Sequence, residues 1–63
     1  MLTVEITSQY NNKNNTYSFN TLKEANDFLV NNGFIYDSGE EDVDYWVQNQ
    51  FTFAVVRTNE EGN

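Results

Sequence analysis

The stretch from Thr21 to Phe34 constrains the fold most, because it has the pattern of an amphipathic helix with two marked ends. Thr21 and Glu24 have the spacing of a capping box, in which each side chain accepts the backbone N–H of the other residue. Gly33 can adopt the left-handed conformation that ends a helix, which lets Phe34 pack back on the last turn. The apolar positions between these ends form one stripe: Leu22, Ala25, Phe28 and Leu29. Other segments must therefore cover this stripe.

The segments before the helix predict a β-hairpin. Leu2, Val4 and Ile6 alternate with polar residues, which is typical of a strand with one buried face. Residues 11–15 are four asparagines and a lysine, and asparagine favours turns because it tolerates positive φ. Residues 16–20 resume an extended pattern, so the two segments are expected to pair as antiparallel strands.

The segments after the helix predict two more strands. Residues 34–36 begin an extended segment, and residues 37–42 are expected to form an exposed acidic loop. Residues 45–47 and 51–56 have the composition of strands. Residues 48–50 are either the turn of a hairpin or a bulge in one long strand, and the hairpin is favoured.

These elements predict an α+β domain in the order β-β-α-β-β, with an antiparallel sheet of about four strands and the helix packed on one face. Residues 1–63 are expected to form one small domain, in which residues 59–63 fray. The expected core comprises Leu2, Val4, Ile6, Phe19, Leu22, Ala25, Phe28, Leu29, Phe34, Trp46, Phe51, Phe53 and Val55. With Trp46 facing the helix, the uncovered face of the sheet is expected to present Tyr45, Val47, Ala54 and Val56.

The residue types exclude most catalytic chemistry. The chain has no cysteine and no histidine, so disulfides, thiolate chemistry and the usual zinc sites are excluded, and no serine has a histidine base. A buried pocket of ~300 Å³ would cost about 7 kcal/mol, more than the ~3–5 kcal/mol of stability usual for so small a domain. We therefore expect a protein that is not an enzyme, with no catalytic, cofactor-binding or metal-binding residues.

The charge of the chain restricts its partners. Ten acidic residues stand against three basic ones, which gives a net charge of −7. Direct binding to nucleic acid or to an anionic membrane needs clustered lysine and arginine, so neither is expected. A basic protein remains a possible partner. No apolar run reaches the ~20 residues that span a bilayer, and no basic segment with an apolar stretch begins the chain, so a cytoplasmic location is expected.

An acidic segment follows the helix and is the first candidate for partner binding. Five carboxylates fall within eight residues: Asp37, Glu40, Glu41, Asp42 and Asp44. The spacing of a calcium-binding loop is not met, which favours an ordinary solvated turn over a calcium site. Carboxylates about 5 Å apart in an extended loop would resemble the phosphates of one nucleic-acid strand, so mimicry of nucleic acid is an alternative.

The sequence resembles small acidic proteins of phages and prophages of low-GC Gram-positive bacteria. The resemblance lies in the segment TLKEANDFLVNNGF, residues 21–34, placed between a hairpin and a strand that contains tryptophan. The composition, which is rich in asparagine, tyrosine and phenylalanine and lacks proline, cysteine and histidine, also resembles that of such proteins. Proteins of this kind with an assigned activity often bind and block a host defence or regulatory protein, so the resemblance implies a binding role.

Two classes of function follow from these observations. The favoured one is a non-enzymatic module that binds a basic host or phage protein through the acidic loop or the uncovered sheet face. It includes the mimic of nucleic acid that inhibits a host DNA-binding or defence protein. The alternative is a structural domain without a ligand, which forms a homodimer through the uncovered sheet face and whose acidity serves solubility.

Overall fold

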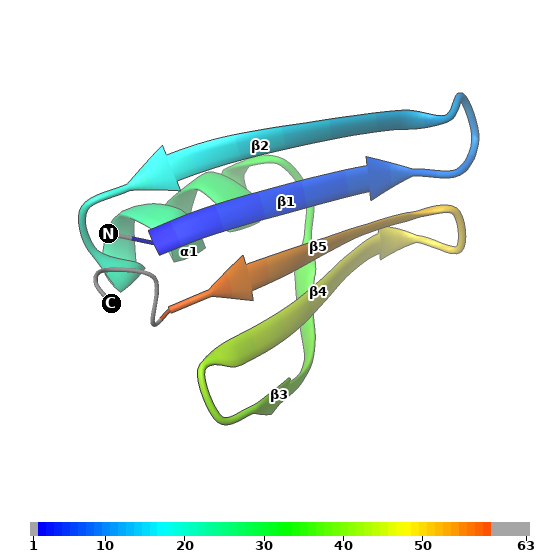
Figure 1. Ribbon diagram of the computed structural model, residues 1–63. Coiled ribbons are helices and arrows are strands. Elements are labelled where there is room, and N and C mark those ends of the chain that lie inside the picture. Colours follow the sequence, from blue (N-terminus) through cyan, green and yellow to red (C-terminus); the bar gives the residue numbers. More distant parts are fainter. Residues whose placement is uncertain (1, 59–63) are drawn as a thin grey trace.

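The computed structural model describes residues 2–58, and these residues form one five-stranded antiparallel sheet with one helix on one face (Figure 1). The strand order in the sheet is β2-β1-β5-β4-β3. The elements are β1 (Leu2–Ser8), β2 (Lys13–Phe19), α1 (Leu22–Asn31), β3 (Ile35–Glu40), β4 (Val43–Asn49) and β5 (Thr52–Arg57). The α+β class is confirmed, and the sheet has one strand more than expected. The expected fraying of residues 59–63 lies outside the described residues.

The first hairpin forms as predicted, but its turn comprises residues 9–12, and Lys13, Asn14 and Asn15, which were expected in the turn, begin β2. β1 and β2 pair one for one from Leu2 opposite Phe19 to Ser8 opposite Lys13. Leu2 and Val4 are buried beneath the helix, and the alternating polar residues Thr3 and Glu5 lie on the other face of the sheet. Within the turn, Asn12 has a φ of 57°, the left-handed conformation that asparagine tolerates.

The helix has the ends that the sequence predicts. The Thr21 hydroxyl accepts the Glu24 backbone N–H at 3.2 Å, and the Glu24 carboxylate accepts the Thr21 N–H at 3.4 Å, which completes the capping box. At the other end Gly33 has a φ of 85°. The Gly33 N–H donates to the Val30 carbonyl at 3.1 Å and the Phe34 N–H to the Leu29 carbonyl at 2.9 Å, which is the Schellman arrangement. Phe34 is thereby turned into the core.

Substituting Gly33 with alanine is expected to lower the free energy of unfolding by about 1 kcal/mol. The cost comes from the positive φ, which a Cβ disfavours. Crowding adds little, because the nearest atom to an added Cβ is the Gln48 amide nitrogen at 3.9 Å. Urea unfolding followed by circular dichroism measures the loss. Asn31→Ala, at the exposed last residue of the helix, is the control and should be neutral or slightly stabilising. Equal unfolding midpoints for Gly33→Ala and the native protein would contradict the expectation.

The acidic segment differs from the expectation. Residues 37–40 belong to strand β3, and the connection to β4 is a two-residue turn, Glu41 and Asp42. Asp42 has a φ of 69°, which aspartate adopts more readily than most residues. The register with β4 shifts between Tyr36 and Ser38, so a bulge accommodates the extra residue. Most of the acidic segment is therefore a paired strand and not the exposed loop that was expected.

The last two strands form a hairpin, as favoured, and a bulge, which was part of the alternative, is present as well. β4 and β5 are joined by Gln50 and Phe51, and the register shifts between Val47 and Asn49, so the hairpin contains a bulge at its end. The Asn49 side-chain oxygen accepts the Phe51 N–H at 2.8 Å and stabilises the turn.

The direction of the side chains in β5 was predicted wrongly. Trp46 lies opposite Ala54 in the register, and residues opposite each other in an antiparallel pair point to the same face. Ala54 and Val56 are therefore buried on the helix side, while Phe53 and Val55 lie half-buried on the other face. The strand is apolar on both sides, so alternation alone cannot set its register.

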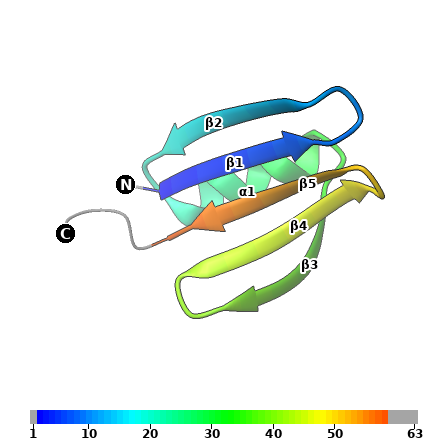
Figure 2. The same cartoon turned by 45° about the vertical axis from the view of Figure 1, so that its right-hand side comes forward.

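The core lies between the helix and the sheet. Its buried members are Leu2, Val4, Ala25, Leu29, Phe34, Trp46, Ala54 and Val56, with Ile6, Phe19 and Phe28 packed against them. Leu22 and Phe51 were expected in this core and are exposed. The helix packs over β1 and β2, and β3 lies away from it at the far edge (Figures 1 and 2). Within residues 2–58 no helix combines the length and apolar character needed to cross a membrane.

Candidate binding surface

The face of the sheet opposite the helix carries a continuous apolar surface over β3, β4 and β5. Cross-strand pairs place its members in rows: Ile35 lies opposite Val47, and Val47 lies opposite Phe53. The next row pairs Tyr45 with Val55. We call this surface the open-face patch, and it consists of Ile35, Val43, Tyr45, Val47, Phe53 and Val55. Figure 2 shows that no helix or strand within residues 2–58 covers this side of the three strands.

Solvent reaches the open-face patch most at its β3 and β4 side. Ile35 is 69% exposed and Val47 is 36% exposed, while the other four members are half-buried. At the β1 side the patch ends at an ion pair between Arg57 and Glu5, with 3.7 Å between the guanidinium and carboxylate atoms. Both partners are substantially exposed, so the pair contributes little stability. Its charges mark the polar border of the patch.

The five acidic residues do not lie in one row. Glu40 pairs with Val43 and lies on the same face as the open-face patch, whereas Asp44 lies opposite Gly39 on the helix face. Glu41 and Asp42 are at the turn between the two strands. The structure thus places carboxylates on both faces of the β3–β4 hairpin, instead of the evenly spaced line that an extended loop would give. Among the described residues no group of three acidic residues is arranged to hold a metal ion.

The Tyr36 side chain covers a gap in the same hairpin on its helix face. Its ring meets Trp46 edge-on, with ring centroids 5.7 Å apart. An added Cβ at Gly39 would collide with the Tyr36 hydroxyl and would lie 2.7 Å from the Asp44 carboxylate. Gly39 therefore leaves the space that the tyrosine occupies, in the manner of an aromatic ring that shields a glycine near a sheet edge.

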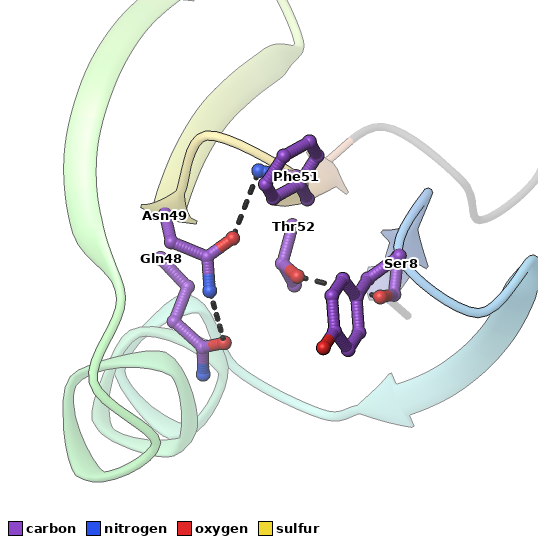
Figure 3. Close-up of a pocket in the computed structure, with 6 residues that line it drawn as sticks. Ser8, Gln48, Asn49, Phe51 and Thr52 are labelled. Atoms are coloured by element: carbon purple, nitrogen blue, oxygen red, sulfur yellow. Dashed lines mark hydrogen bonds between the residues drawn. The ribbon is translucent and has the colours of Figure 1, made fainter.

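A shallow hollow lies at the ends of the hairpins, far from the acidic turn. It has a volume of about 320 Å³, is open to solvent, and is lined by Ser8, Tyr10, Gln48, Asn49, Phe51 and Thr52. Figure 3 shows the hydrogen bonds that fix its wall: the Thr52 hydroxyl donates to Ser8 at 3.4 Å, and the Asn49 amide donates to Gln48 at 3.4 Å. The lining residues include no aspartate, glutamate, lysine or arginine.

One ionisable group with a shifted pKa lies outside these surfaces, on the exposed side of the helix. Asp27 raises the pKa of Lys23 above 10.5, first through a hydrogen bond of 2.8 Å and then through its charge. The stability that this ion pair contributes is therefore fully present below the pKa of Lys23 in the unfolded chain. It is lost as the pH rises through the higher pKa of Lys23 in the folded protein. Both side chains are largely exposed, so the pair acts on the helix surface and not on a binding site.

No family model, curated protein or solved structure matches this chain. The chemistry of the surface itself is therefore the basis for a proposed function. The open-face patch and the neighbouring acidic turn are its two most distinctive surface features.

Sequence reasoning identified part of this surface. Tyr45 and Val47 do lie on the uncovered face, as expected. Ala54 and Val56 were expected there and are fully buried, so those two assignments are corrected. Four members of the open-face patch were missed: Ile35, Val43, Phe53 and Val55. Pairing of Trp46 with Ala54 was the signal that could have identified Phe53 and Val55. When Ala54 points inward, these two neighbours in β5 must point outward.

Proposed function

We propose that the protein is a non-enzymatic binding module that holds a basic partner protein against the open-face patch. The observation that carries this proposal is the position of contiguous apolar rows beside an acidic turn on one uncovered sheet face. The partner is expected to present an apolar centre with lysine or arginine at its border. A host or phage protein encountered in the cytoplasm suits both the absence of cysteine and the resemblance to small acidic phage proteins.

Both the apolar contact and the basic character of the partner have a physical reason. Removal of apolar surface from water contributes about 25 cal/mol per Å², and Ile35 and Val47 offer such surface on the uncovered face of the sheet. The net charge of −7 attracts a basic partner and raises its rate of association. Glu40 lies in the row next to Tyr45, so a cation at the border of the partner would meet a carboxylate directly beside the apolar contact.

Removing the exposed side chains of the patch is expected to weaken binding at least tenfold. The double variant Ile35→Ser/Val47→Ser removes apolar surface without adding charge, and a loss of ~1.4 kcal/mol corresponds to a factor of ten in Kd. Partners are first captured from cell lysate with the immobilised native protein and identified. Each captured protein is then purified, and its Kd for the native protein and for each variant is measured by isothermal titration calorimetry.

The matched control is Val30→Ser. Val30 is 59% exposed, close to Ile35 in accessibility, but it lies on the helix at the other side of the molecule. Its removal should leave the Kd unchanged. Higher salt should weaken binding of the native protein if the partner is basic. A purified partner that binds the double variant as tightly as the native protein would show that the open-face patch is not the binding surface.

A further inference from the structure

The two edges of the sheet are protected to different degrees. An edge strand leaves N–H and C=O groups unpaired on its outer side, and proteins commonly block such edges with bulges, charges or proline. β3 is blocked twice, by its bulge and by the carboxylates of Asp37 and Glu40. β2 is less protected, because its 7 residues pair one for one with β1 without a bulge, include no carboxylate and no proline, and carry their single charge, Lys13, at the first position of the strand. The N–H and C=O groups on the outer side of β2 can therefore pair with another strand along its length.

We propose that a second copy of this chain pairs with β2, antiparallel across a two-fold axis, so that the two sheets join into one. Complete overlap of the two strands places Thr16, the middle residue of β2, opposite Thr16 of the second copy. Asn14 then faces Ser18, and Asn15 faces Tyr17. Threonine pairs are favourable across antiparallel strands, and the exposed hydroxyl and amide groups can hydrogen-bond to one another. The strand is therefore complementary to itself.

Charge favours β2 over β3 as the contact between copies. Each copy carries a net charge of −7, so a dimer must keep its carboxylates apart. Glu5 lies opposite Thr16 in β1, and in the joined sheet the two Glu5 residues are three strand spacings apart, about 14 Å. This separation exceeds the screening length of about 8 Å at physiological salt, and Arg57 lies beside each Glu5. Pairing through β3 would instead bring carboxylates of the two copies within about 5–10 Å.

Aromatic side chains add apolar surface to this contact. On the helix face Tyr17 is 38% exposed, and its ring centroid lies 4.9 Å from that of Phe28. Phe19 packs on the same ring at 5.2 Å. A two-fold axis perpendicular to the sheet keeps both helices on one side, so the second copy brings its own aromatic trio next to the first. Water-exposed ring surface is thereby buried on pairing.

Sedimentation across a range of concentrations tests the proposal with the unmodified chain. The native protein is expected to sediment as a dimer at about 100 µM and to dissociate on dilution. The variant Asn14→Lys/Ser18→Lys places a lysine opposite a lysine in both symmetric pairs and should weaken dimerisation at least tenfold. The control Asn11→Lys/Gln50→Lys makes the same change in net charge within two exposed turns and should dimerise as the native protein does.

Oxidative cross-linking tests the position of the axis independently. The chain has no cysteine, so a single introduced thiol reports one contact. Thr16→Cys is expected to form a disulfide between copies, because residues opposite each other at the axis have suitable Cα separations. Ser38→Cys, an exposed position in the other edge strand, should remain reduced under the same conditions.

Three results would overturn the proposal. They are a monomer at every concentration, a dimer that tolerates the lysines in β2, and equal cross-linking of the two cysteine variants. A dimer lost in Ile35→Ser/Val47→Ser and kept in Asn14→Lys/Ser18→Lys would assign self-association to the open-face patch instead. Because β2 is not part of that patch, failure here leaves the proposed binding of a basic partner to its own test.

Discussion

Replacing Ala54 with aspartate is expected to unfold the protein. Ala54 is 0% exposed and lies between Ile6 of β1 and Trp46 of β4 in the sheet register. A carboxylate at this position would be buried without a partner, which costs at least about 3–5 kcal/mol. A domain of this size has only ~3–5 kcal/mol of stability, so the folded population should be lost. Far-UV circular dichroism and the dispersion of amide NMR signals measure the outcome.

The matched control for this prediction is Val47→Asp. Val47 lies on the other face of the sheet and is 36% exposed, so its carboxylate can remain hydrated. The expected loss is about 1 kcal/mol or less, and the variant should stay folded. The comparison decides which face of the sheet meets the helix. A folded Ala54→Asp variant together with an unfolded Val47→Asp variant would reverse the side-chain directions of both strands.

Replacing Leu29 with alanine is expected to remove most of the stability of the fold. Leu29 is 0% exposed and is among the largest fully buried side chains. Truncation leaves a cavity at the centre of the contact between helix and sheet, and such changes cost about 2–5 kcal/mol. Since the whole domain is expected to hold ~3–5 kcal/mol, the variant should be largely unfolded or should unfold at far lower urea concentration. Urea titration followed by tryptophan fluorescence reports the change, because Trp46 is in the same core.

Val30→Ala controls for the loss of a large apolar side chain from the same helix. Val30 is the next residue and is 59% exposed, so the change should stay within about 0.5 kcal/mol. Alanine also has the higher helix propensity, which offsets any small loss of packing. Similar unfolding midpoints for Leu29→Ala and Val30→Ala would mean that the helix packs on the sheet through a different face.

Elements whose conformation is set by neighbouring residues were predictable from the sequence. The capping box of Thr21 and the glycine at position 33 determine the two ends of the helix through local hydrogen bonds and backbone geometry. The strict alternation of β1 likewise determines which of its side chains are buried. These parts of the fold depend on interactions within a few residues, so local patterns contain the information.

Elements whose conformation depends on distant pairing were not predictable in the same way. The polar, acidic segment of β3 becomes a strand because β4 supplies hydrogen bonds along its length, and neither its composition nor its charge indicates this. In β5 both sets of alternate residues are apolar, so the buried set is decided by pairing with β1, where Val4 meets Val56. The outward position of Phe53 and Val55 follows from that choice, so these two members of the open-face patch were missed for the same reason that Ala54 and Val56 were misplaced.

The strand order determines when the sheet can be completed during synthesis. β5 lies between the β1–β2 hairpin and the β4–β3 hairpin and is hydrogen-bonded to both. During synthesis, each hairpin can close as soon as it leaves the ribosome, but the two cannot be joined until residues 52–57 have emerged. A nascent chain that stops before that point contains two separate hairpins with unpaired edges. Such a chain is expected to be sensitive to proteolysis and prone to aggregation.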